Sequence, residues 1–177
     1  MTDIQEDPRY LDYTKDFFAR ITMIDKRYPS LEYALSLSWD RTKLAPQYDW
    51  LLASSYLVPG PTFKFAYHSQ TENRLHFNIS DTGQNANKKL GVSRNGYLGL
   101  YEVSEVSDYW KLEPLRWTDR GLVCQWRDHR GHEVKQLGGT GLRFFGEPVF
   151  YLNVDGGEVH HFLIEMMPAG GWPDTEE

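Results

Sequence analysis

The chain has 177 residues, of which 40% are hydrophobic and 25% charged, a composition typical of one globular domain. Its formal charge is −6 and no basic stretch is available to follow a phosphate backbone, so we expect no nucleic-acid partner. The single cysteine, Cys124, excludes a framework of intrachain disulfides.

Residues 1–12 form a polar, acidic lead-in without the basic start and apolar run of a signal peptide, so we expect a cytoplasmic location. No apolar stretch is long enough to cross a membrane, and we expect no membrane contact. Residues 13–27 fit two interpretations. Phe17, Phe18 and Ile21 are spaced for one helical face, whereas Ala19, Ile21 and Met23 alternate as in a half-buried strand. We favour a strand from about residue 18, preceded by a helical turn.

Short apolar or alternating segments, separated by turn residues, continue as far as residue 167. The expected strands are 18–24, 34–39, 63–67, 74–80, 97–103, 122–126, 149–154 and 161–166. Asn95-Gly96 is a strong hairpin signal, because both central residues of a type I′ turn need a positive φ. Many short strands at close spacing predict an all-β sandwich or closed barrel.

Three segments of the chain resemble one another, which indicates an internal repeat. In each, a large aromatic residue leads a closing apolar strand, and these residues are Trp50, Trp110 and Phe162. The segments also open alike, with alternating strands at 18–24, 63–67 and 122–126. We therefore predict one domain over residues 1–177, with units at approximately 17–57, 62–116 and 121–167 and polar tails.

Three units of four short strands, each closed by an aromatic-led strand, resemble a β-trefoil, and in particular the ricin-B-type lectin domain. Units of that family end in Gln-x-Trp, and the nearest segments here are Gln47-Tyr48-Asp49-Trp50 and Tyr109-Trp110, with Phe162 replacing Trp in the third unit. Residues 151–162 are similar to the closing hairpin of fascin-like trefoils. The resemblance implies that Trp50, Trp110 and Phe162 share a core layer. A calycin-type β-barrel and an α+β cone remain alternatives.

No pattern in the sequence identifies a metal, cofactor or nucleophile. A metal site needs at least three convergent ligands, whereas His129 and His132 lie in a polar turn and the adjacent His160 and His161 point to opposite sides of a strand. Cys124 stands in an apolar strand, where a cysteine behaves as a small hydrophobic residue. We therefore expect no cofactor and no metal, and nothing identifies an enzyme.

The lectin resemblance implies shallow sugar pockets, in which an Asp accepts hydrogen bonds from sugar hydroxyls and an aromatic ring stacks on the sugar. Asn95 and Asn153 could add amide contacts. A competing interpretation is that Asp40 and Asp81 only cap turns. The candidate ligand-binding residues are Trp39, Asp40, Asn78, Asp81, Tyr97, Tyr101, Trp126 and Asp128.

The leading functional prediction is a non-enzymatic, lectin-like module whose partner is carbohydrate or another small molecule. One alternative is a protein-binding trefoil of the protease-inhibitor kind, which would use the loops 59–62 and 84–89. The other is an isomerase or cyclase with an aromatic-lined pocket. A deep apolar cavity would favour this enzyme, and a solid core would exclude it. The residues suspected of catalysis are His68, His76, Asp128, His129 and Glu133.

Overall fold

The computed structural model describes residues 2–37, 50–55, 61–82, 88–102, 109–138, 143–144 and 146–167. Strands dominate this part of the chain, so the all-β prediction is confirmed. The predicted binding residues Trp39 and Asp40 lie outside it, as do most residues of the loops 59–62 and 84–89. Within the described ranges, no helix has the length and apolar character needed to span a membrane.

Two short helices precede the first strand, where the sequence predicts a helical turn. Helix α1 (Thr2–Glu6) is followed by a 3-10 helix (Pro8–Thr14) and then by β1 (Phe17–Ile24). Asp7 caps the 3-10 helix, because its carboxylate accepts a hydrogen bond from the Arg9 amide at 2.9 Å. The buried Tyr13 hydroxyl donates to the Ile164 carbonyl at 2.8 Å, which anchors the helical segment to the last strand.

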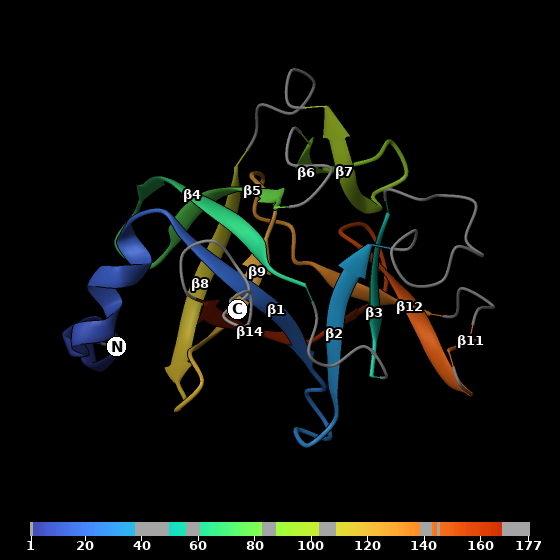
Figure 1. Ribbon diagram of the computed structural model, residues 1–177, viewed down its shortest axis with the longest axis horizontal. Coiled ribbons are helices and arrows are strands. Elements are labelled where there is room, and N and C mark those ends of the chain that lie inside the picture. The colour runs from blue at the N-terminus through green and yellow to red at the C-terminus, as the bar shows by residue number, and fades with distance from the viewer. Residues whose placement is uncertain are drawn as a thin grey trace, which may run out of the picture.

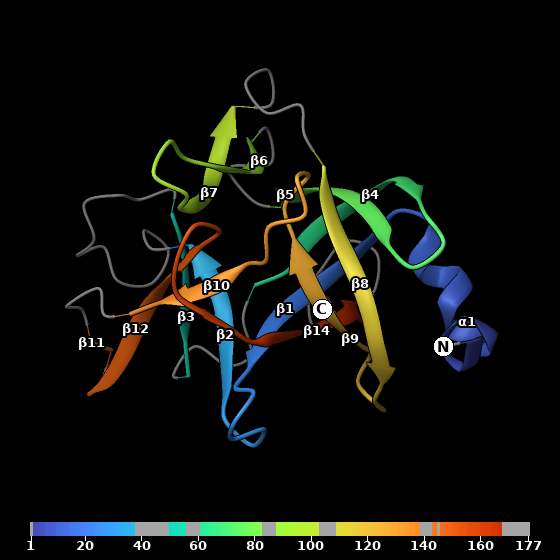
Figure 2. The same cartoon turned by 180° about the vertical axis from the view of Figure 1, so that it is seen from behind.

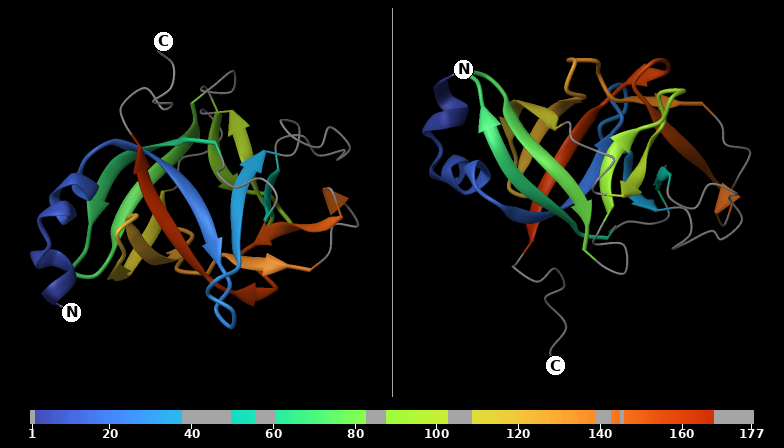
Figure 3. Two further views of the ribbon diagram at one scale, coloured as in Figure 1. Left: turned by 60° about the horizontal axis from the view of Figure 1, so that its bottom comes forward. Right: turned by 90° about the horizontal axis from the view of Figure 1, so that it is seen from above.

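Six antiparallel strands form a closed barrel. In ring order they are β1, β4 (Phe63–Gln70), β5 (Leu75–Asp81), β8 (Trp110–Trp117), β9 (Leu122–Arg127) and β14 (His161–Met167), which pairs with β1 again. Figure 3 shows β1 and β14 running side by side. Closure removes the free edges through which sheets aggregate. The ring has six strands, unlike the eight of the calycin-type alternative.

Three pairs of strands extend from the barrel and meet one another. They are β2 (Glu32–Leu37) with β3 (Leu51–Ser54), β6 (Lys88–Val92) with β7 (Leu98–Glu102), and β10 (Lys135–Leu137) with β12 (Glu147–Asn153). The two-residue strands β11 (Arg143–Phe144) and β13 (Glu158–Val159) extend the third pair. Strand β3 pairs with β12, and single bridges join Trp50 to Gly99 and Tyr97 to Asn153. Figures 1 and 2 show these hairpins gathered on one side of the barrel, away from α1.

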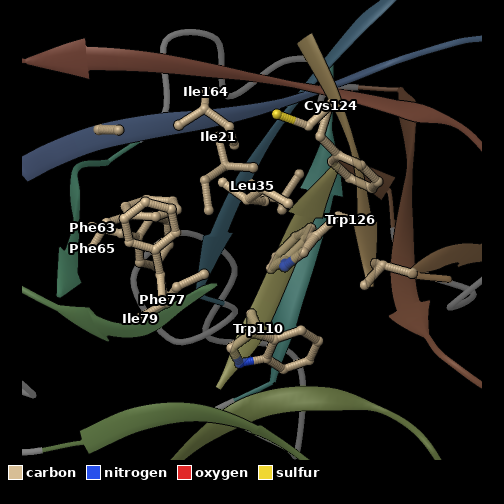
Figure 4. Close-up of a cluster of buried hydrophobic side chains, with 14 of the residues drawn as sticks. Ile21, Leu35, Phe63, Phe65, Phe77, Ile79, Trp110, Cys124, Trp126 and Ile164 are labelled. Atoms are coloured by element: carbon tan, nitrogen blue, oxygen red, sulfur yellow. The ribbon is translucent and has the colours of Figure 1, made fainter. Parts of the chain in front are cut away.

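The pairing register of the barrel repeats three times. A buried pair joins the first and last barrel strand of each repeat: Ala19 with Phe63, Phe77 with Trp110, and Cys124 with Phe162. A second set joins successive repeats: Phe65 with Ile79, Leu112 with Trp126, and Ile164 with Ile21. These side chains fill the interior (Figure 4). Strands β4 and β8 also break register at the same step, at Tyr67/Ser69 and Pro114/Arg116.

The register corrects one member of the expected aromatic layer. Trp110 and Phe162 occupy matching positions, but Phe63 rather than Trp50 is the third. Trp126 lies between Trp110 and Phe162, with ring centroids 5.4 and 5.1 Å away. Trp50 instead leads β3, a hairpin strand. An aromatic residue before a short apolar strand occurs in both the hairpin and the barrel, so the motif alone does not separate them.

Candidate functional site

A cleft of about 650 Å³ opens between the β6–β7 hairpin and the turns that follow β9 and β12. Small-molecule sites generally occupy about 300–1,000 Å³, so its size suits a ligand. Its lining is mixed in character, with aromatic rings beside charged side chains. The residues that matter below are Arg94, Tyr101, Tyr109, Asp128, Arg130 and Asp155.

Asp128 shapes one wall of the cleft by closing the turn after β9. Its Oδ1 accepts hydrogen bonds from the amides of Arg130 at 3.0 Å and His132 at 2.8 Å, and its own amide donates to the His132 carbonyl at 2.9 Å. Its Oδ2 lies 3.4 Å from the His132 imidazole. Asp25 closes the turn after β1 in the same way, with the amides of Arg27 and Tyr28. Asp128 therefore caps a turn, which is the role that the competing interpretation gives to Asp40 and Asp81.

Tyr109 lies immediately before β8, and its ring contacts two imidazole rings. His68 stacks on it with a centroid distance of 4.4 Å, and His76 stacks on it at 4.6 Å. The Ser69 hydroxyl bridges the two histidines, 2.7 Å from Nδ1 of His68 and 2.9 Å from Nδ1 of His76. The break in register of β4 makes this arrangement possible, because it skips His68 and pairs Ser69 with His76. A ring held in place loses little freedom when a ligand binds.

The hairpin turn 93–97 supplies another wall of the cleft. A hairpin lies where it is expected, but the Gly96 amide donates to the Ser93 carbonyl at 2.9 Å, so Arg94 and Asn95 are the central residues of the turn instead of Asn95 and Gly96. Gly96 has a φ of +89°, and it stands directly against the Asp155 carboxylate, where a side chain would collide. The turn is tied to the third hairpin by two hydrogen bonds, from the buried Asn153 amide to the Asn95 carbonyl and from Val154 to the Gly96 carbonyl. Asn153 is therefore occupied in holding the cleft together.

The predicted binding residues divide among several places. Tyr101 and Asp128 line the cleft. Tyr97 stacks on Trp50 with centroids 4.4 Å apart and meets the edge of Tyr151 at 5.4 Å, so these three rings join the three hairpins. Trp126 is 2% exposed and packs in the barrel interior, where it has no surface to offer a ligand.

Asn78 and Asp81 lie on β5 and are not part of the cleft lining. The Asp81 carboxylate accepts a hydrogen bond from the next amide, that of Thr82, at 2.8 Å, as a turn cap does. The contributions of Arg94, Tyr109 and Asp155 to the cleft were not predicted, since no binding motif marks these residues in the sequence. No protein-family model matches the chain, and no curated protein matches its sequence.

Cys124 and His160 are buried and behave as structural residues. Cys124 is fully buried, as expected, and burial raises the pKa of its thiol, which disfavours the reactive thiolate. His160 is also buried, and its Nδ1 accepts a hydrogen bond from the Lys26 amide at 3.0 Å. Among the side chains described, no group of three His, Cys, Asp or Glu residues is placed to hold a metal ion.

Buried histidines should make the protein less stable in mild acid. Burial lowers the pKa of His76, His160 and His161, so each binds a proton more readily after unfolding. Their stabilising contribution is complete above the ordinary histidine pKa of about 6.5 and is lost as the pH falls through their lowered values. Urea unfolding should therefore give a smaller free energy at about pH 5.5 than at about pH 7.5. His160→Gln should reduce that difference, and an equal or larger free energy at the lower pH would contradict the prediction.

Proposed function

We propose that the chain is a β-trefoil that binds carbohydrate in this cleft without catalysing a reaction on it. The trefoil assignment is supported by the six-stranded ring, by the three hairpins that meet at its side, and by the threefold repeat of buried pairs in the register. A trefoil consists of such a closed barrel with three hairpins, one from each unit.

The observation that carries the carbohydrate proposal is the aromatic ring of Tyr109 beside polar groups in one cleft. A sugar presents an apolar C–H face that can stack on such a ring, and hydroxyls that need directional hydrogen bonds. Here Asp155 provides an acceptor, and the guanidinium groups of Arg94 and Arg130 provide donors. Apolar contact and polar contact are therefore available to one small ligand.

Tyr109→Ala should weaken sugar binding by at least about tenfold, because an aromatic contact contributes about 0.5–1.5 kcal/mol beyond the surface that it buries. Binding is measured by titrating a panel of monosaccharides and disaccharides, up to millimolar concentration, against the labelled protein in NMR spectra. Tyr28→Ala is the matched control, since Tyr28 is 60% exposed in the turn between β1 and β2 and is absent from the cleft lining. The Tyr28→Ala variant should bind sugar with the same affinity as the unchanged protein.

Two results of this titration would count against the proposal. If the unchanged protein binds no sugar of the panel at millimolar concentration, the carbohydrate function is wrong. If Tyr109→Ala keeps full affinity while the fold is intact, the site lies elsewhere. Tyr109→Phe keeps the ring and should keep most of the affinity, which separates loss of stacking from loss of the hydroxyl.

The contacts of the suspected catalytic residues favour a binding module over the enzyme alternative. His68 and His76 are engaged with Ser69 and Tyr109, and the Glu133 carboxylate accepts a hydrogen bond from Gln125 at 2.8 Å. The barrel interior is filled with side chains, and the cleft has a charged lining rather than a deep apolar one. These features match the solid core that argues against an enclosed catalytic pocket.

A further inference from the structure

Among the arginines that the structure describes, two in the cleft differ from most others in having no acidic partner. Arg94 comes from the hairpin turn 93–97, and Arg130 from the turn after β9. Neither guanidinium forms an ion pair with any carboxylate in the part of the chain that the structure covers. By contrast, ion pairs engage Arg9, Arg27, Arg74, Arg120 and Arg127. The protein is acidic overall, so two unneutralised cations at one cleft need a reason.

The carboxylates in the same cleft do not neutralise these arginines. Asp128 is buried, and its charge is directed to two backbone amides and the His132 imidazole. Asp155 is exposed, and its carboxylate packs against Gly96, with Oδ2 only 2.6 Å from the place that a Cβ on this glycine would occupy. Asp155 can still accept a hydrogen bond from a ligand hydroxyl. The cleft is therefore lined by two arginines without an ion pair, one carboxylate acceptor and Tyr109.

We propose that the ligand of this cleft is an acidic sugar, whose carboxylate is bound by Arg94 and Arg130 while its ring packs against Tyr109. The inference rests on the proposed carbohydrate function and specifies the class of sugar. A guanidinium is planar and can donate two parallel hydrogen bonds to one carboxylate, which fixes the orientation of the group. Asp155 would accept from a hydroxyl elsewhere on the same ring, so a neutral sugar keeps part of the contacts but loses the charged ones.

Two matched pairs of sugars test the inference: glucuronate against glucose, and galacturonate against galactose. Within each pair the acidic member differs only by a carboxylate in place of a hydroxymethyl group. We expect the acidic member to bind at least about tenfold more tightly, since a hydrogen bond to a charged group contributes about 1.5–3 kcal/mol. This preference should shrink as salt is added, because exposed charges are screened. Acetate at the same concentration should not displace the sugar.

Arg94→Gln and Arg130→Gln should each weaken uronate binding by about tenfold and neutral-sugar binding by clearly less, because glutamine can still donate a hydrogen bond to a hydroxyl but carries no charge. Arg116→Gln is the control for the change in net charge, since Arg116 is exposed on β8 and absent from the cleft lining. It should leave both affinities as they are. If both members of each pair bind equally, the acidic-sugar inference is overturned and the carbohydrate function stands. If neither binds, the carbohydrate function fails as well. Unchanged uronate affinity in both cleft variants overturns the assignment to these two arginines. Displacement by acetate overturns the contribution of the sugar ring, because acetate supplies the carboxylate alone.

Discussion

Trp126→Ala is expected to lower the free energy of unfolding by about 3–5 kcal/mol, the usual cost of removing a large aromatic side chain from a core. Trp126 is 2% exposed, pairs with Leu112 across the barrel wall and contacts the rings of Trp110 and Phe162. Figure 4 shows it between Trp110 and Cys124, in the middle of the filled barrel. The loss should appear as a lower urea midpoint and a lower melting temperature.

Two companion variants make the Trp126 result specific. Leu11→Ala, at a side chain that is 67% exposed, should change stability by no more than about 0.5 kcal/mol. Trp126→Phe keeps an aromatic ring in the core and should cost less than the alanine variant. If Trp126→Ala folds normally and instead loses sugar affinity, Trp126 is a binding residue after all and its place in the core is wrong.

Gly157→Ala should also be strongly destabilising, by about 3 kcal/mol or more. Gly157 has a φ of +120°, a conformation that side chains rarely tolerate, and a Cβ would collide with the carbonyl of Gln136. Gln136 belongs to β10 and pairs with Leu152 of β12, so the collision acts on the backbone of the third hairpin. Thermal unfolding of the variant measures the effect.

The neighbouring Gly156 provides a matched control for the Gly157 variant. A Cβ at Gly156 would have no atom within 4 Å, and Gly156 is not among the glycines with a positive φ. Gly156→Ala should therefore change stability by no more than about 0.5 kcal/mol, in either direction. Equal losses in the two variants would mean that the close approach to Gln136 is not the cause.

The strands that the sequence predicts well are those with one apolar face. Strands are expected at residues 74–80 and 161–166, and the structure has Leu75–Asp81 and His161–Met167. Strand β10 (Lys135–Leu137) is not predicted, because its three residues are all half-buried and show no alternation. The sequence pattern places Trp50 in the barrel, but a hairpin strand differs from a barrel strand in its pairing and not in its local pattern. The pairing joins residues far apart in the chain, and a local motif does not contain it.

The candidate site is predicted less completely than the fold for the same reason. Tyr101 and Asp128 are among the predicted binding residues, although on grounds other than the cleft itself. Tyr109 stands out in the sequence only as the neighbour of Trp110. It reaches the histidines because β5 pairs with β8, which sets His76 opposite Lys111. Arg94 and Arg130 stand in turns, where many sequences place charged residues for solubility, so only the assembled cleft distinguishes them.

The pairing of β1 with β14 has a consequence for how the protein is made on the ribosome. Tyr13 and Ile164, which share a hydrogen bond, are 151 positions apart. Strand β1 leaves the ribosome well before β14, the strand that covers one of its edges. The barrel therefore closes only after β14 has emerged, and such distant contacts form slowly. Until then, the apolar face of β1 and its unpaired amides are open to other nascent chains, and folding factors that shield them would matter most for this first strand.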